Sequence, residues 1–296
     1  MRSPTGSGNV SRAKVAPLFG LPAVLVVALL LYVPFLYTTY ISFTKYNGLG
    51  DPQVIGLTNY KTMFSDPDLT GSLINTGMWV VGIVTIPVAM GMAIAVLTHG
   101  HRFGSWLRLP FLLPYAVSGV AVGVIWNFIL ESKGAFGQVL GALGLPGADT
   151  GWLLGTPLAT VMMIMASAWQ GTGVNALLFV VGLQSIPKEP LEAARMDGAT
   201  GFRLFWHQLL PQLRPITTVV IGLSIVGSLK TFDVVWAMTQ GGPGTSTSTL
   251  AISMYKETFV LNDYGQGAAV ALLLSVVTFA ASAIYLRYQL ADSKVV

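Results

Sequence analysis

The sequence predicts an all-helical integral membrane protein with six transmembrane helices and cytoplasmic N- and C-termini. Three observations indicate this fold class: the composition, the apolar stretches and the distribution of Lys and Arg. Hydrophobic residues make up 53% of the 296 residues and charged residues only 9%, whereas a typical soluble protein has about 25% charged residues. A water-soluble globule of this length cannot cover its surface with so few charges. Most apolar side chains must therefore face lipid or other buried helices.

Six apolar stretches are long enough to cross a bilayer, which takes about 20 residues. The first follows Arg2, Arg12 and Lys14, as a secretory signal peptide would. Its apolar region is too long for a signal peptide and no small-residue cleavage site ends it, so we expect a retained helix. The expected spans are about Val15–Ile41, Leu73–Leu97, Leu109–Leu130, Leu158–Leu183, Ile216–Met238 and Gly267–Leu286.

Prolines interrupt three of these spans: Pro22 and Pro34 in the first, Pro87 in the second and Pro114 in the third. Inside a bundle, neighbouring helices can satisfy the backbone groups that a proline frees. We therefore expect kinks at these positions and not helix ends.

The basic residues orient the chain. With the N-terminus inside, eleven Lys and Arg lie in cytoplasmic segments and only Lys45, Lys61, Lys133 and Lys256 lie outside, as the positive-inside rule requires. Residues 1–14 then form a cytoplasmic tail. Residues 15–296 form one transmembrane domain, with a cytoplasmic loop over 184–215. No segment between spans is long enough for a soluble domain.

Several kinds of site are excluded or disfavoured. The chain has no cysteine, so disulfides and thiolate metal sites are excluded. No run of Lys and Arg is dense enough to indicate nucleic-acid binding. His99, His101 and His207 have no companion at metal-ligand spacing, so we expect solvated histidines and no metal site. The sequence has no Gly-rich phosphate loop of the G-x-x-x-x-G-K-[ST] kind, so another chain must bind the ATP of any ATP-driven process.

The loop over 184–215 predicts two short helices. Pro187 and Pro190 suit a helix entry, and Asp197-Gly198 suits a helix end because glycine adopts the left-handed conformation without strain. A second helix, about Gly201–Leu210, places aromatic residues on one face before Pro211 ends it. Taken alone, such a pair is typical of an amphipathic loop lying on the bilayer.

The spacing within this loop is similar to a known motif. Glu192-Ala193-Ala194, then Gly198, then Gln208-Leu209-Leu210-Pro211 resembles the EAA loop of ABC-importer permeases, with a departure at Gln208, where an aliphatic residue is usual. The resemblance implies the type I ABC-importer permease fold and a coupling helix that docks into a cytoplasmic ATPase. The ATPase-contacting positions that it implies are Glu192, Ala193, Ala194, Asp197 and Gly198.

A second segment narrows the resemblance. Phe232-Asp233, followed by Gly241-Gly242-Pro243 in an expected tight outer turn, is similar to the outer loop of carbohydrate permeases of the type related to the larger maltose permease subunit. This resemblance implies a multi-pass protein of a prokaryotic plasma membrane that imports a sugar or oligosaccharide by alternating access. The alternatives are a permease for another small polar solute, such as a glycerophosphodiester, and, less favoured, a membrane-embedded enzyme or a proton-coupled transporter.

The same resemblance implies the partners. They are a second homologous permease subunit, a cytoplasmic ATPase dimer that holds ATP and Mg, an extracytoplasmic sugar-binding protein and membrane lipid. We expect no cofactor in this chain, no nucleic acid and no catalytic residue.

A neutral sugar needs hydroxyl, amide and aromatic partners inside the bundle. Polar and small residues at helical spacing provide candidates, although the same residue types also mediate ordinary helix packing. Lys230 and Asp233, three residues apart, are expected to pair on one helix face as a structural ion pair or a gate element. The candidate pathway residues are Tyr115, Trp126, Asn127, Gln170, Gly171, Val174, Gly227, Ser228 and Thr231.

Overall fold

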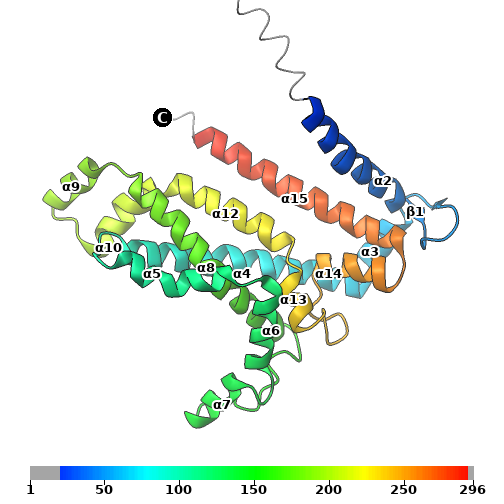
Figure 1. The fold of residues 1–296 in the computed structure, drawn as a ribbon, viewed down its shortest axis with the longest axis horizontal. Coiled ribbons are helices and arrows are strands. Elements are labelled where there is room, and N and C mark those ends of the chain that lie inside the picture. Colours follow the sequence, from blue (N-terminus) through cyan, green and yellow to red (C-terminus); the bar gives the residue numbers. More distant parts are fainter. Residues whose placement is uncertain (1–20, 293–296) are drawn as a thin grey trace, which may run out of the picture.

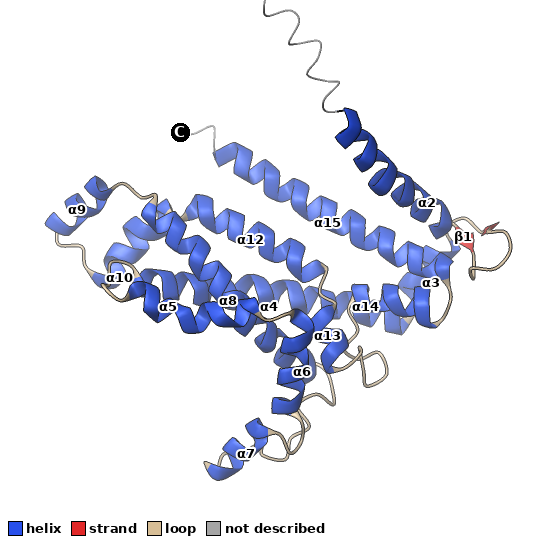
Figure 2. Ribbon diagram, viewed as in Figure 1, coloured by secondary structure: helices blue, strands red, loops and turns tan. Residues whose placement is uncertain are grey.

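The structure, a computed structural model, describes residues 21–292 and is almost entirely helical (Figures 1 and 2). The tail expected over residues 1–14 lies outside the described residues. Four helices are long and apolar enough to cross a membrane: Leu21–Ser42, α4 (Pro67–Thr98), α8 (Leu158–Gln184) and α15 (Tyr264–Asp292). In α15 the candidate span is Tyr264–Arg287. Two further candidate spans are sharply bent pairs of helices, Gly104–Ala116 with Gly119–Ala142 and Gly201–Gln212 with Arg214–Leu229, so the described residues hold four to six possible spans.

The N-terminal helix, Leu21–Ser42, contains a π-helical turn, η1 (Ala28–Tyr32), and continues as α2 (Val33–Ser42). It runs beside α15 but apart from the rest of the bundle (Figure 1), and almost all of its surface is free. After it, β1 (Thr44–Lys45) pairs antiparallel with β2 (Gln53–Val54), and α3 (Thr58–Ser65) follows.

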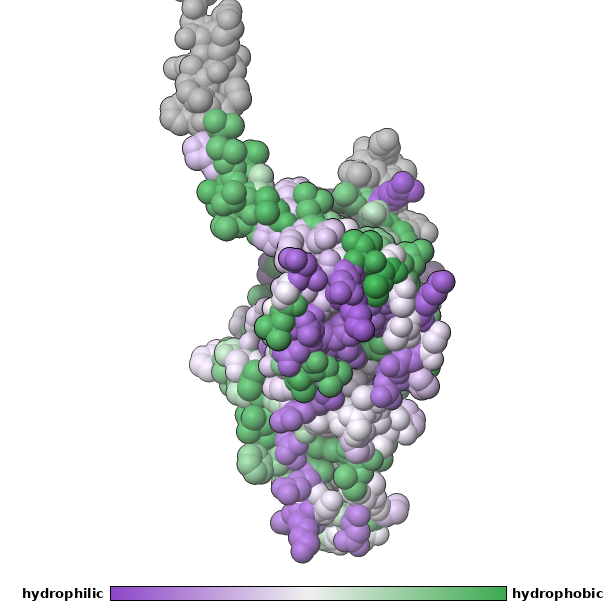
Figure 3. Space-filling view, turned by 90° about the vertical axis from the view of Figure 1, so that its right-hand side faces the viewer, coloured by the Kyte–Doolittle hydropathy of each residue, from purple (hydrophilic) through white to green (hydrophobic). Residues whose placement is uncertain are grey.

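The segment after the N-terminal helix is anchored to α3. The buried Asn59 Nδ2 donates hydrogen bonds to the carbonyls of Ser42 (2.9 Å) and Thr44 (2.8 Å). Hydrophilic side chains gather at this end of the molecule, while the N-terminal helix is hydrophobic (Figure 3). This contrast is what a span and its water-exposed end require.

α4 and α8 form the centre of the bundle and pack closely through glycines. A Cβ atom at Gly91 would lie 2.8 Å from the backbone nitrogen of Ala176, and one at Gly82 would lie 2.6 Å from Ile164 Cγ2. Small residues at such contacts let helix backbones approach each other. Pro87 remains inside α4 without ending it, as expected.

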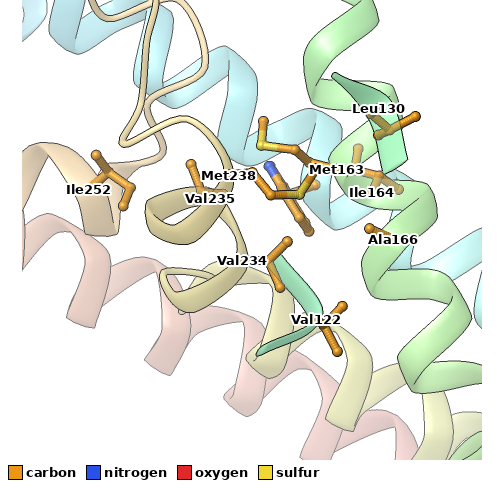
Figure 4. Close-up of a cluster of buried hydrophobic side chains, with 10 residues drawn as sticks. Val122, Leu130, Met163, Ile164, Ala166, Val234, Val235, Met238 and Ile252 are labelled. Atoms are coloured by element: carbon orange, nitrogen blue, oxygen red, sulfur yellow. The ribbon is translucent and has the colours of Figure 1, made fainter. Parts of the chain in front are cut away.

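The hydrophobic core is organised as separate clusters along the bundle. One, drawn in Figure 4, joins α4, α6, α8, α13 and α14 around the fully buried Trp79 and Met163. A second, which includes Phe179 and Leu213, joins α4, α8 and α12 nearer the loop at 184–215. The first cluster therefore packs the short helices α6 (Gly119–Leu130) and α13 (Asp233–Met238) against the bundle.

The expected span over 109–130 is broken, which corrects that prediction. α5 (Gly104–Leu112) passes into a 3₁₀ turn, η2 (Leu113–Ala116), and the chain then bends by 99° into α6 (Gly119–Leu130) and α7 (Ala135–Ala142). Pro114 lies in the 3₁₀ turn, and Ser118 caps α6 by accepting a hydrogen bond from the backbone of Ala121. α6 and α7 project sideways from the bundle (Figure 1).

The expected span over 216–238 is also broken. α12 (Arg214–Leu229) ends at Lys230, and α13 (Asp233–Met238) begins after a short break over 230–232. Lys230 therefore lies at the break and Asp233 at the start of α13, so the expectation that they share one helix face is wrong. α14 (Leu250–Tyr255) and the π-helical η4 (Lys256–Val260) then lead to α15.

Candidate functional site

The two broken spans meet around one open cavity of about 350 Å³, which is lined by both polar and apolar side chains. Tyr115 and Gly119 reach it from the first break and residues 230–234 from the second, while α4, α8 and the end of α12 supply the remaining walls. Discontinuous helices whose ends line a cavity are typical of membrane transport sites. The cavity contains six of the nine candidate pathway residues: Tyr115, Gln170, Gly171, Gly227, Ser228 and Thr231.

The donors and acceptors in the cavity come from different helices. Gln170 on α8 is partly committed, because its Nε2 donates to the carbonyl of Val117 at the first break (2.7 Å). Ser228 is buried and its Oγ donates to the carbonyl of Ile225 (2.9 Å), which leaves oxygen lone pairs as acceptors. Ser167 adds a further hydroxyl. The cavity can therefore form hydrogen bonds with a hydroxyl-rich solute from several sides.

Three candidates do not line the cavity. Asn127 Nδ2 donates to the carbonyl of Met238 (2.7 Å) and so ties α6 to the end of α13. Trp126 packs edge-on against Trp169, with ring centroids 6.0 Å apart. Val174 lies one helical turn along α8 from Gly171 and does not reach the cavity wall. Trp126 and Asn127 therefore contact other parts of the chain, and their place in the pathway stays a prediction, as does that of Val174.

Sequence reasoning missed several cavity-lining positions, including Trp79, Ile83, Gly119, Phe232 and Val234. Trp79 and Ile83 lie within a long apolar span, where nothing in the local pattern distinguishes a cavity wall from a core contact. The remaining three flank the helix breaks, which hydropathy does not reveal.

The two charges at the second break suit the helix ends they occupy. Lys230 is the C-terminal cap residue of α12 and Asp233 is the first residue of α13. Asp233 also lies against the first turn of α6, since a Cβ at Gly119 would be 3.2 Å from its Oδ2. Cations are favoured at helix C-termini and anions at N-termini. Both side chains are exposed and line the cavity.

The loop at 184–215 folds as two short helical segments. α9 (Lys188–Met196) ends at Asp197, and Gly198 takes φ = +82°. The Gly198 backbone N–H donates to the Arg195 carbonyl (3.0 Å), and that of Ala199 donates to the Ala194 carbonyl (2.9 Å). The helix end that the sequence predicts is therefore confirmed. Ala194 is buried against its own chain, while Glu192, Ala193, Asp197 and Gly198 are exposed.

The second helical segment is longer than expected. α10 (Gly201–Leu204) continues through a π-helical turn, η3 (Phe205–Leu209), into α11 (Leu210–Gln212), so Pro211 does not end it. Pro211 is tolerated because it stands at the start of α11. Phe202 stacks on Trp206, with ring centroids 5.9 Å apart, and both are exposed, as is Met196 at 88%. This exposed apolar group, with α9 beside it, forms a surface suited to a partner protein.

The segment after α13 is a well-anchored loop, here called the outer loop (residues 239–249). Gly241 has φ = +83°, and Gly242-Pro243 is a cis peptide. A Cβ at Gly241 would collide with the Ser248 side chain, so only glycine fits. Thr247, Ser248 and Thr249 are at most 1% exposed. The expected tight turn is present, but much of the loop is buried.

Asn75 of α4 holds this loop in place. Its Nδ2 donates to the carbonyls of Ser246 (2.8 Å) and Ser248 (3.0 Å). The Thr76 hydroxyl of the same helix accepts a hydrogen bond from the backbone N–H of Leu250 (3.0 Å). The polar side chains at 75 and 76 in an otherwise apolar helix are the signal that could have found this anchor.

Glu257 lies beyond the outer loop, between α14 and α15, outside the candidate spans. Partial burial raises the pKa of its carboxyl, and the nearby Asp263 and Asp66 raise it further. The folded protein therefore binds this proton more tightly than the unfolded chain does. Its contribution to stability is greatest below the unfolded pKa, 4.5, and is lost as the pH rises through the folded pKa.

We expect Glu257→Gln to raise the melting temperature at pH 7 to 8, by on the order of 1 °C because solvent screens a partly buried group. The gain should disappear below pH 4.5. Melting curves of the detergent-solubilised protein at several pH values measure it. Glu131→Gln, at an exposed glutamate, is the matched control, and an equal gain in that variant or a gain independent of pH would contradict the assignment.

Within residues 21–292 no group of three or more His, Cys, Asp or Glu side chains could hold a metal ion. His101 Nδ1 accepts a hydrogen bond from the Phe103 backbone (3.1 Å), and His207 Nδ1 lies 3.1 Å from the Arg203 carbonyl. Both contacts are local turns.

Comparison with known proteins identifies the family of this chain and several of its relatives. Residues 85–291 match the family described as "binding-protein-dependent transport system inner membrane component". A probable ABC transporter permease protein of Pyrococcus horikoshii is 35% identical over 260 residues, covering 87% of this chain and 89% of that protein. The sulfoquinovosyl glycerol transport system permease protein SmoG of Agrobacterium fabrum is 34% identical over 274 residues, covering 90% and 87%.

The fold is also found in a solved structure. A chain of a bacterial alginate ABC transporter, crystallised with its alginate pentasaccharide-bound periplasmic protein, superposes with a TM-score of 0.80 at 18% identity. The superposition covers 94% of each chain.

Proposed function

This chain belongs to the family of inner-membrane components of binding-protein-dependent transport systems, and we propose that it forms half of the translocation pathway for a sugar or oligosaccharide. The observation that carries the proposal is the cavity at the meeting point of the two broken spans. A pathway must open and close around its cargo, and helix breaks supply both polar backbone groups and points of flexure at membrane depth.

The cavity suits an uncharged polyol. Its lining combines the aromatic ring of Tyr115, the amide of Gln170 and the hydroxyls of Ser167, Ser228 and Thr231. The one cation and one carboxylate, Lys230 and Asp233, balance in charge. A carbohydrate cargo also agrees with the relatives, since SmoG is named for sulfoquinovosyl glycerol and the structural neighbour is involved in the import of alginate, an acidic polysaccharide. Both of these cargoes are anionic, so they support the carbohydrate class and not the absence of charge.

The movement driven by ATP hydrolysis would be transmitted to this chain through the loop over 184–215. Its exposed α9 and its apolar group of Met196, Phe202 and Trp206 offer a docking surface for a cytoplasmic ATPase. α12 begins directly after this loop, at Arg214, and ends at the break beside the cavity. Movement of the docked loop would therefore reach the cavity along one helix. ATP and Mg would be held by the ATPase, and a second permease subunit would supply the other half of the pathway.

We further propose that α5 with α6 forms one span and α12 with α13 another, which gives six spans with both termini in the cytoplasm. The outer loop and the α6–α7 projection then belong to the extracytoplasmic half, where a sugar-loaded binding protein would dock. The distribution of Lys and Arg supports this orientation.

Topology can be tested with alkaline phosphatase fusions, which are active only outside the cytoplasm. A fusion after Gly244, in the outer loop, should be active, and one after Gly198 should be at least about ten-fold less active at equal expression, because a cytoplasmic fusion does not fold into active enzyme. β-Galactosidase fusions at the same two positions should give the opposite pattern. Activity of the Gly198 phosphatase fusion would refute the N-inside arrangement.

The function itself is tested by reconstitution. The chain is co-expressed with a second permease and an ATPase from its own genome, purified by a tag on this chain alone, and placed in proteoliposomes with a candidate binding protein. We expect both partners to co-purify with this chain. We also expect the proteoliposomes to take up a radiolabelled sugar in an ATP-dependent manner. Co-purification without uptake of any sugar or oligosaccharide, but with uptake of a solute that is not a carbohydrate, would overturn the proposed cargo; absence of the ATPase would overturn the proposed function.

A further inference from the structure

Each break in a span leaves backbone carbonyls without their helical partners, and in each case a side chain from another element satisfies one of them. Gln170 Nε2 donates to the Val117 carbonyl at the first break (2.7 Å). Thr249 Oγ1 donates to the Thr231 carbonyl at the second (3.0 Å). A part-buried carbonyl that loses such a partner is left without a hydrogen bond, which is unfavourable. These contacts therefore fix the breaks in one geometry.

Thr249 connects three parts of the molecule through one hydroxyl. It is the last residue of the outer loop and the N-terminal cap of α14, and it is 1% exposed. Its Oγ1 donates to the Thr231 carbonyl and accepts from the backbone N–H of Ile252 (3.4 Å). Thr249 does not line the cavity, whereas Thr231 does. Its hydroxyl can therefore affect the cavity only through the backbone at the break.

The elements on the outer side of this contact are rigidly held. Asn75 fixes the outer loop to α4 through two hydrogen bonds. The hydroxyls of Ser72 and Ser253, 2.6 Å apart, join α4 to α14. On the inner side, α12 leads to the loop at 184–215. Between the two sides stand residues 230–232, which lie outside α12 and α13 and keep two soft torsions each.

We propose that Thr249 is a positioning residue that transmits the movement of α12 across this break to the outer loop. With the contact intact, the outer end of α12 and the outer loop move together. Without it, residues 230–232 form a loose joint, and α12 moves without opening the outer side. The inference rests on the proposed transport function.

The test compares matched variants. Thr249→Val keeps the side-chain shape and removes both hydrogen bonds, and Thr249→Ser keeps both. Thr76→Val is the control, because the Thr76 hydroxyl is also buried, donates to the Ser72 carbonyl and accepts from Leu250, yet does not touch the break. Its loss should lower stability to a similar degree. Thr249→Ala removes the hydroxyl without the extra methyl group and replaces the valine variant if that one does not assemble.

The readout needs no knowledge of the cargo. The chain has no cysteine, so Gly227→Cys is the only thiol of this subunit; Gly227 lines the cavity and a Cβ there meets nothing within 4 Å. In complexes with a cysteine-free partner, a membrane-impermeant thiol reagent is added outside, with and without vanadate-trapped nucleotide. Basal ATPase activity is measured in parallel.

We expect trapping to accelerate labelling of Gly227→Cys in the otherwise unchanged chain and in the Thr76→Val and Thr249→Ser variants. In Thr249→Val the acceleration should fall about ten-fold, with basal ATPase activity and complex yield retained. Equal behaviour of Thr249→Val and Thr76→Val would overturn the inference, as would failure of both Thr249→Val and Thr249→Ala to assemble. No acceleration in the unchanged chain would instead overturn the proposed function.

Discussion

Gly198→Val should uncouple the transporter. Gly198 has φ = +82°, a conformation that a β-branched residue adopts only at a cost of about 1–3 kcal/mol. Both hydrogen bonds that end α9, from the N–H groups of Gly198 and Ala199, depend on that turn. The exposed face of α9 would then no longer meet the ATPase in its docked geometry. We expect uptake and stimulated ATP hydrolysis to fall at least about ten-fold, with membrane insertion unchanged.

Two variants separate the docking role from general strain. Gly198→Asn should retain most activity, because asparagine tolerates the left-handed region. Gly144→Val places the same strain on an open glycine with φ = +65° beyond α7, on the proposed outer side, and should leave coupling intact. ATPase assays on purified complexes with and without sugar-loaded binding protein give the measurement. Normal stimulation in Gly198→Val would rule out this turn as part of the docking surface.

Gly227→Trp should block passage while the complex still assembles. Gly227 is exposed on α12, lines the cavity and has open space where a side chain would extend. An indole there would occupy much of a cavity of about 350 Å³. We expect uptake to fall by two orders of magnitude or more, because blocking is steric and not a matter of one hydrogen bond. Complex yield and basal ATPase activity should be retained.

The matched control lies on the same helix. A Cβ at Gly222 would be 2.6 Å from Tyr285 Cδ2 of α15, so Gly222→Trp should disrupt α12–α15 packing and lower complex yield. Gel-filtration yield and sugar uptake, measured together, separate the two effects. Loss of the complex in Gly227→Trp would mean that this face of α12 is a packing surface. Uptake near the unchanged level would mean that the cavity is not the pathway.

The long helices could be predicted from the sequence because crossing a bilayer is a local requirement. α4, α8 and α15 contain the expected spans, since about 20 apolar residues suffice to indicate a span. The breaks could not be predicted this way, because hydropathy averages over a window and both breaks fall within apolar surroundings. Pro114 gave a signal for the first break. At the second break, the only signal was the charge of Lys230 and Asp233. These two charges are equally compatible with an ion pair on one helix and with the ends of two helices.

The site was predictable only where spacing along one helix determined it. Gln170 and Gly171 reach the cavity because they lie three and four residues after Ser167 on one side of α8, and Gly227 and Ser228 reach it from the last turn of α12. Trp126 and Asn127 do not, because the bend before α6 turns them toward other partners. The buried outer loop depends on Asn75, more than 170 residues away in the chain. A local pattern cannot report a partner at that separation.

The glycine contacts between α4 and α8 have a mechanical consequence. At Gly91 the backbone of α4 lies against the backbone of α8 at residues 175–176, and at Gly82 it lies against the Ile164 side chain, so we expect the two helices to resist sliding and to behave as a fixed frame. We expect flexure around the cavity to be concentrated at residues 117–118 and 230–232, which lie between helices at the two breaks. The two breaks would then act as hinges on either side of a rigid pair of helices. The amplitude of the conformational change would be limited by how far those short segments can rotate, and not by deformation of the helix bundle.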